Sequence, residues 1–324
     1  MAARLASMDT TTSIDDLFSP GIATDFFQVR DIQSFDPLAT KTFSRRNALW
    51  LAEFSRLIYR REKSEAPAAH VLPTRSEVLN RHGWTEHRAF DTGGTTAAIF
   101  KNAGTELNSV VFVFRGTLGL RDMFTDIQVP MTKWDGRGQV HAGFLNALNP
   151  VWGDIRHELQ SLQVPAFFTG HSLGAALATL AAARVLLDSS LTSPAALYTF
   201  GSPRVGDVDF RENLRGLFHA RVVNDRDIVT TVPPVVSLPF FPLYQHCGQQ
   251  HRLFPDGTVE ISHNDSDIAG ERSRFKGVTD FIENVSGLMR LPNPGDLLPQ
   301  PLIDHIPKNY TVRIRDVPHT HSAS

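Results

Sequence analysis

The chain has 324 residues, of which 41% are apolar and 20% are charged, and its formal net charge is −2. This is an ordinary globular composition, long enough for one large α/β domain or two small ones. The Lys and Arg residues are scattered, so nothing in the sequence suggests a nucleic-acid-binding surface and we expect no nucleic-acid partner. No apolar run approaches the roughly 20 residues of a membrane-spanning helix.

Cysteine and histidine usage bears on the compartment and on metals. Cys247 is the only cysteine, so no intramolecular disulfide can form, and residues 1–18 lack the apolar core of a secretory signal. These features favour a reducing compartment such as the cytoplasm, and they leave export by a non-classical route open. The pair His157-Glu158 is not followed by the second His of a zinc-protease helix, so we expect no metal and no cofactor.

The N-terminal part of the chain predicts an arm followed by a helix. Residues 1–38 are polar and rich in Thr, Ser and Asp, which is typical of a loose arm. Residues 47–60 carry apolar side chains at helical spacing, which predicts a helix with one face toward the core. Since no internal repeat or second boundary follows, we expect a single domain over 39–316 and a short tail over 317–324.

Strand-like and helix-like segments then alternate. The run Val110–Phe114 is apolar throughout, as expected of a strand covered on both faces. We expect it to be a neighbour of a second strand over residues 97–100. Two later runs, 196–200 and 220–223, are also strand-like and are separated by an Arg-rich segment of helical length. This alternation predicts an α/β fold with a mainly parallel sheet and helices on both faces.

Two further segments follow the last of these strands. Residues 232–243 are apolar and Pro-rich, which indicates a loop with apolar walls. Residues 252–261, with Asp256-Gly257 at their centre, predict a β-hairpin.

The most informative motif is Gly170-His171-Ser172-Leu173-Gly174. It lies between an apolar strand-like run, 164–169, and an Ala/Leu-rich run, 173–187. This order predicts a strand, a sharp turn and a helix, with the Ser172 hydroxyl held at the apex in a strained backbone. The alternative is a plain turn with a capping serine, and we expect His171 to pack beside the turn without acting as a base.

A serine nucleophile needs an acid and a histidine later in the chain. Asp225 and Asp227 both follow the strand-like run 220–223, where loops of such sheets carry functional residues. Several histidines come later and are candidates for the base: His246, His251, His263, His305, His319 and His321. The residue pattern alone leaves the choice of acid and of base open.

Six segments in order resemble the class 3 (fungal-type) lipases, an α/β-hydrolase family. The matching segments are Val113–Thr117, Val140–Phe144, Gly170–Gly174, Tyr198–Gly206, Asn224–Val229 and Asp304–Tyr310. The resemblance implies an α/β-hydrolase fold and the catalytic residues Ser172, Asp227 and His305. It also implies an oxyanion hole formed by Thr117 and the main-chain N–H of Leu173.

The resemblance further implies an activity. We expect a serine carboxylic-ester hydrolase that acts on lipid esters of the triacylglycerol or diacylglycerol type, through an acyl-enzyme intermediate. A phospholipase A1 or a general esterase is the alternative within this class. A lipase-like domain that binds a lipid or a protein partner without chemistry is the alternative of another class.

The segment 118–128 predicts a lid over the substrate site. Leu120, Met123, Phe124 and Ile127 fall at helical spacing and form one apolar face, and Leu118 precedes them next to Gly119, a hinge candidate. The position directly after Thr117 resembles that of the family's lid, so we expect contact with lipid at an interface. The alternative is a fixed helix packed on the core.

Overall fold

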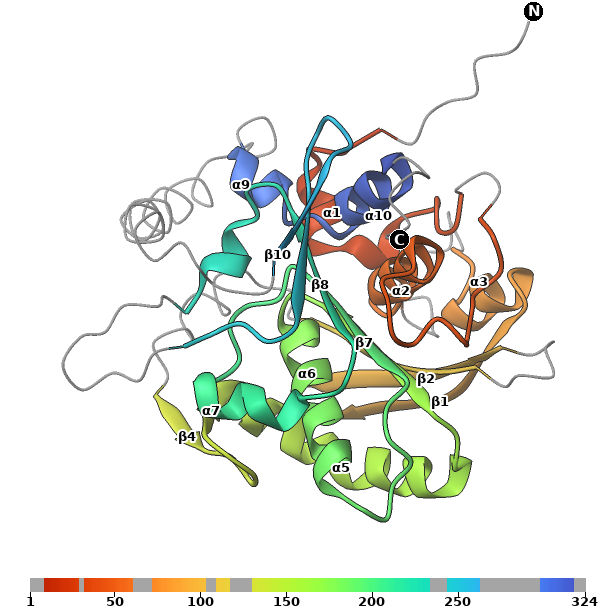
Figure 1. Ribbon diagram of the computed structural model, residues 1–324. Helices are drawn as coiled ribbons and strands as arrows, with labels where there is room; N and C mark the ends of the chain where they lie inside the picture. Colours follow the sequence, from red (N-terminus) through yellow and green to blue (C-terminus); the bar gives the residue numbers. More distant parts are fainter. Residues whose placement is uncertain are drawn as a thin grey trace, which may run out of the picture.

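The structure is a computed structural model. It describes the residues 9–28, 32–60, 72–102, 109–116, 130–233, 244–262 and 298–317. A central eight-stranded sheet dominates, with the strand order β1-β2-β3-β6-β7-β8-β9-β10 (Figure 1). The five strands β3, β6, β7, β8 and β9 are parallel to one another, and antiparallel strands complete both edges.

The strands of the sheet have the following bounds: β1 Trp84–Thr92, β2 Thr95–Asn102, β3 Val110–Phe114, β6 Ala166–His171, β7 Ala196–Phe200, β8 His219–Asn224, β9 Gln249–Leu253 and β10 Val259–Ser262. A separate two-stranded ribbon pairs β4, Met131–Lys133, with β5, Gln139–His141.

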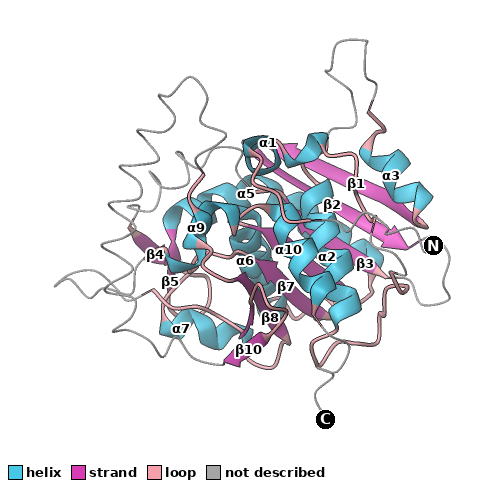
Figure 2. Cartoon of the chain, turned by 90° about the horizontal axis from the view of Figure 1, so that it is seen from above, coloured by secondary structure: helices cyan, strands magenta, loops and turns pink. Residues whose placement is uncertain are grey.

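Helices cover both faces of the sheet (Figures 1 and 2). The α-helices are α1 Ile14–Phe18, α2 Arg45–Leu57, α3 Arg75–Arg81, α5 Ala142–Leu162, α6 Leu173–Leu187, α7 Val208–Arg211, α9 Gln300–Ile303 and α10 Pro307–Asp316, and the 3₁₀ helices are η1 Pro20–Ile22, η2 Glu212–Leu214 and η3 Ile228–Thr231. None of the helices in these described ranges is long and apolar enough to cross a membrane.

The two faces of the sheet carry two separate apolar cores. Side chains of α2 and α10, among them Phe54 and Ile314, pack with Val111 and Val113 of β3 on one face. Side chains of α5 and α6 pack with Phe112 of β3 on the other. Every residue of β3 is therefore buried, which is the physical reason for its uninterrupted apolar sequence.

Local signals account for the start of several helices. Ser44 accepts a hydrogen bond from the Asn47 N–H at the start of α2, and Thr74 forms a capping box with Glu77 at the start of α3. α6 is apolar on nearly all sides because it is enclosed between the sheet and α5. The prediction of a mainly parallel sheet with helices on both faces is confirmed.

Two expectations about the chain differ from the structure. The described part of the N-terminal segment is not a loose arm: Phe26, Phe27 and Phe35 are buried in the core, and the Thr11 N–H donates to Asn309 Oδ1 at 2.7 Å. The apolar area of these rings stabilises the packing of a segment whose overall composition is polar. The Arg-rich segment before β8 forms the four-residue α7 and the 3₁₀ helix η2 in place of one regular helix.

Several predicted features lie outside the described residues. These are Thr117, the lid segment 118–128, most of the apolar loop 232–243, and the histidines His263, His319 and His321.

Candidate active site

Ser172 lies on a sharp turn between β6 and α6, as the motif predicts. Its backbone has φ 59° and ψ −128°, a conformation that costs energy for a residue with a side chain. The Ser172 N–H donates to the Phe200 carbonyl at 2.9 Å, which ties the turn to the end of β7. The residue is 4% exposed, so its hydroxyl lies within the protein rather than on an outer surface.

The glycines of the motif allow the main chains around Ser172 to approach closely. A Cβ on Gly170 would collide with the backbone of Gly174, and a Cβ on Gly174 would collide with the backbone of Phe114. The turn is therefore compact because both positions lack a side chain.

Asp227 lies in the loop after β8 and caps η3. Its Oδ1 accepts a hydrogen bond from the Val229 N–H at 2.8 Å, and its Oδ2 accepts one from the Tyr310 hydroxyl. The side chain is almost fully buried, at 1% exposure of the residue. A buried carboxylate held by several donors has a fixed orientation.

His305 lies between α9 and α10 and faces Asp227. Its Nδ1 donates to Asp227 at 2.9 Å from Oδ1 and 2.8 Å from Oδ2, across 78 residues of sequence. His305 is 1% exposed. This contact fixes the imidazole so that Nε2 is the nitrogen available to another group.

Gly201 lies directly against the Asp227–His305 pair. Its φ is +58°, and an added Cβ would lie 2.7 Å from Asp227 Oδ2 and 3.0 Å from His305 Nδ1. The absence of a side chain at the end of β7 therefore leaves the space that the acid and the histidine occupy.

His171 packs beside this pair, as the sequence predicts. Its Nε2 donates to the main-chain carbonyl of His305 at 2.8 Å, and the two rings are 4.5 Å apart between centroids. Burial, followed by the proximity of His305, holds the pKa of His171 well below its usual range. His171 is therefore a neutral donor at physiological pH.

Tyr310 approaches the same carboxylate from α10. It is 1% exposed, and its hydroxyl donates to Asp227. Burial, together with the negative charge of Asp227, raises the pKa of Tyr310 well above its usual value, so the phenol keeps its proton. Tyr310 and Gly201 have roles that our sequence reasoning did not assign, and the only signal was their place within two of the six matching segments.

The other candidates for the acid and the base within the described residues have different contacts. Asp225 pairs with Arg226 at 3.7 Å between Oδ2 and Nε. The Nε2 of His246 contacts the Thr230 carbonyl at 2.7 Å, and the ring of His251 stacks on Phe43. Of the candidates in the described ranges, only Asp227 and His305 are in contact with each other.

The main chain near Ser172 comes from the start of α6 and from the residues that follow β3. Leu173 is the first residue of α6, so its N–H has no acceptor within the helix. Gly116, which follows β3, lies close enough that an added Cβ would be 3.4 Å from the Ser172 Cβ. Within the described ranges, no group of three His, Cys, Asp or Glu residues could hold a metal ion.

Comparison with known sequences gives a consistent set of relatives. Residues 111–237 match the family described as lipase (class 3). The chain is 31% identical over 199 residues to a lipase of Rhizomucor miehei, covering 55% of this chain and 52% of the relative. It is 36% identical over 169 residues to the secreted mono- and diacylglycerol lipase 1 of Fusarium solani, covering 49% of this chain and 48% of the relative.

A plant protein named as a phospholipase is also similar to the chain. The chain is 33% identical over 193 residues to phospholipase A1-IIgamma of Arabidopsis thaliana, covering 56% of this chain and 41% of the relative. The matched region thus spans about half the length of these relatives.

Comparison with solved structures agrees. The structure of the Rhizomucor miehei triacylglyceride lipase matches with a TM-score of 0.50 and 26% identity, covering 59% of this chain and 73% of that one. A mutant form of MDLA from Penicillium cyclopium matches with a TM-score of 0.54 and 22% identity, covering 67% and 85%, and this likeness bears on the fold alone. The fold class expected from the sequence, an α/β-hydrolase, is confirmed.

Proposed function

Because residues 111–237 match the class 3 lipase family and the relatives are lipases, we propose that the chain is a member of this family and a serine hydrolase that cleaves carboxylic esters of lipids. The observation that carries the proposal is the contact of His305 Nδ1 with Asp227, together with the contact of His305 with His171, which precedes Ser172 on the strained strand-to-helix turn. A serine, a histidine and a buried acid in this chain order are the residue types that acyl transfer requires.

Each residue has a distinct part in the proposed reaction. Ser172 Oγ attacks the ester carbonyl while His305 Nε2 takes the hydroxyl proton, and the resulting imidazolium is stabilised by Asp227. His305 then gives the proton to the leaving alcohol, and an acyl-Ser172 ester remains. Water, deprotonated by His305, hydrolyses this ester and restores the serine.

The developing oxyanion needs donors close to Ser172. The Leu173 N–H at the start of α6 is one proposed donor, and the helix N-terminus favours negative charge there. Thr117 is the second proposed donor by the family resemblance. Its neighbour Gly116 lies beside the Ser172 Cβ, which supports this assignment.

A glycerolipid ester is the proposed substrate. The names of the relatives include a lipase, a mono- and diacylglycerol lipase and a phospholipase A1, so we favour a triacylglycerol or diacylglycerol and keep a phospholipid as the alternative. The apolar loop 232–243 is the proposed wall of the acyl groove. The segment 118–128, with Leu118, Leu120, Met123, Phe124 and Ile127, is the proposed lid that meets a lipid surface.

Labelling with a fluorophosphonate probe tests the proposal. We expect wild type to be labelled and Ser172→Ala to remain unlabelled, with His305→Ala slowed by several orders of magnitude. Turnover of glycerol esters of varied chain length, with phosphatidylcholine beside them, then ranks the substrates. A folded wild type that is neither labelled nor active would favour the other class, a lipase-like domain that binds without chemistry.

A further inference from the structure

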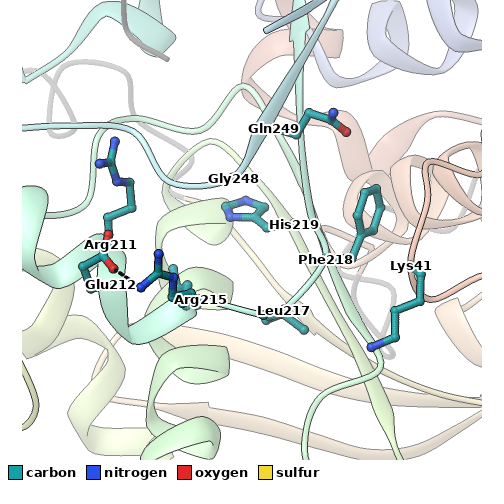
Figure 3. A pocket seen from close by; sticks show the side chains of 11 residues that line it. Lys41, Arg211, Glu212, Arg215, Leu217, Phe218, His219, Gly248 and Gln249 are labelled. Atoms are coloured by element: carbon teal, nitrogen blue, oxygen red, sulfur yellow. Dashed lines mark ion pairs between the residues drawn. The ribbon is translucent and has the colours of Figure 1, made fainter. Parts of the chain in front are cut away.

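A pocket lined by positively charged side chains lies at the amino ends of the parallel strands, whereas the candidate active site lies at their carboxyl ends. It has a volume of about 420 Å³, within the range of small-molecule sites, and is formed around the amino ends of β8 and β9. Ser172 and Asp227 follow the carboxyl ends of β6 and β8, so the two sites are separated by the length of the parallel strands. Figure 3 shows the pocket with the side chains that line it.

Positively charged side chains gather around the pocket, although the net charge of the chain is negative. Lys41, Arg211 and Arg215 line it together with the single carboxylate of Glu212, so its wall carries two more positive than negative charges, whereas the whole chain carries −2. Arg215 pairs with Glu212 at 3.6 Å, but its side chain is 86% exposed, and such a pair is weak. Within the described ranges, no carboxylate lies within ion-pair distance of Lys41 or Arg211.

The pocket is also lined by a buried imidazole that has a hydrogen bond at only one of its two nitrogens. His219 is 5% exposed and lies between the arginines and Gln249 in Figure 3. Its Nε2 contacts the Thr199 hydroxyl at 3.0 Å, while its Nδ1 is buried without a hydrogen-bond partner among the described residues.

The neighbouring glycine keeps the main chain close to this imidazole. Gly248 has a φ of +82°, and an added Cβ would lie 2.6 Å from His219 Nδ1. When the Thr199 hydroxyl donates to Nε2, the proton of the neutral ring is on Nδ1, at the side of Gly248. The neutral ring is therefore part of the pocket wall, with its Nδ1 side covered by the main chain at Gly248.

We propose that this pocket binds a phosphate-bearing ligand, either a soluble phosphate monoester or the head group of a phospholipid. Guanidinium groups match the geometry of phosphate oxygens, and a phosphate dianion balances the two excess positive charges of the wall. Leu217 and Phe218 provide apolar wall for the carbon part of such an ester. The proposal does not depend on the proposed hydrolase activity.

Isothermal titration of the full chain at constant ionic strength tests the proposal, with inorganic phosphate and glycerol 3-phosphate as probes. We expect saturable binding to wild type, and binding weakened about tenfold by Arg211→Gln or by Lys41→Gln. Arg81→Gln removes the same charge from α3, at the opposite edge of the sheet, and should bind as wild type does. Lys41 and Arg81 are exposed and Arg211 is half-buried, so the variants should fold, and thermal unfolding checks this for each of them.

Vesicles distinguish the two sources of phosphate. Flotation with phosphatidylcholine alone is compared with phosphatidylcholine containing phosphatidic acid, with Ser172→Ala as the background to prevent turnover. Binding that needs phosphatidic acid and is lost in Arg211→Gln, without binding of glycerol 3-phosphate, assigns the head group; the reverse result assigns the soluble ester. No saturable binding to any phosphate probe, or equal loss in Arg81→Gln and Arg211→Gln, would overturn the proposal.

Discussion

The imidazole of His171 donates from Nε2 to the main-chain carbonyl of His305 at 2.8 Å. The residue that precedes Ser172 in sequence thus holds the backbone of the residue that contacts Asp227. This bond links the turn after β6 to the segment between α9 and α10, across 134 residues of sequence. His171 is therefore a candidate positioning residue for the proposed base.

Replacement of His171 tests this positioning role. His171→Leu removes the donor and should lower kcat about tenfold, with little change in KM, because about 1.4 kcal/mol of positioning is a typical hydrogen-bond contribution. His171→Gln keeps a donor nitrogen at a similar reach and should recover most of the rate. Steady-state kinetics on a soluble ester measure the effect, and thermal unfolding is the control. An equal loss of activity in both variants would contradict the positioning role.

The choice between the two acids gives a second prediction. Asp227→Asn should lower kcat by roughly 10⁴-fold with an unchanged fold, because an amide favours the wrong tautomer of His305. Asp225→Asn is the matched control: Asp225 pairs only weakly with the exposed Arg226, so its activity should stay close to wild type. If the two variants exchanged these phenotypes, Asp225 would be the acid.

Gly201 gives a third prediction with a matched control. Gly201→Ala should abolish most activity, since the new methyl group would lie 2.7 Å from Asp227 Oδ2 and 3.0 Å from His305 Nδ1. Gly83→Ala places the same strain at a φ of +75° where a Cβ would meet nothing within 4 Å. We expect Gly83→Ala to lose some thermal stability but to keep wild-type kcat. Similar kcat for both variants would show that strain, and not contact with the pair, determines the effect.

The buried histidines predict a dependence of stability on pH. Burial, followed by the nearby Arg221, lowers the pKa of His219 to about 3, and burial holds the pKa of His171 well below its usual range. Below a pH of about 6.5 the unfolded chain therefore binds protons that the folded chain does not, and stability falls as the pH falls. For His219 the loss from pH 7 to pH 5 should be on the order of 2 kcal/mol.

Urea unfolding at pH 7 and pH 5 measures this loss. His219→Gln should reduce the difference in the free energy of unfolding between the two pH values. His157→Gln alters an exposed position on α5 and should leave the difference unchanged. An unchanged difference in His219→Gln would show that other groups account for the pH dependence.

Features encoded in neighbouring residues were predictable from the sequence. The apolar run of β3, the Ala/Leu-rich α6 and the turn at Ser172 each follow from local patterns, because burial on both faces and close backbone approach restrict the residue types allowed at those positions. The order of these segments also predicted a mainly parallel sheet. The short α7 in place of a longer helix was not predicted, since the Arg-rich segment has no strong local signal for where a helix stops.

The tertiary structure alone decided which distant groups meet. The residue pattern by itself does not separate Asp225 from Asp227, although the family resemblance favours Asp227, and the structure adds the contact of Asp227 with His305 across 78 residues. The same holds for Tyr310 on Asp227, for the packing of Phe26 and Phe27 from a segment that is polar overall, and for the pocket that both Lys41 and Arg211 line. Local preferences act over a few residues, whereas these contacts depend on how the sheet and the helices pack, and that arrangement is a property of the whole chain.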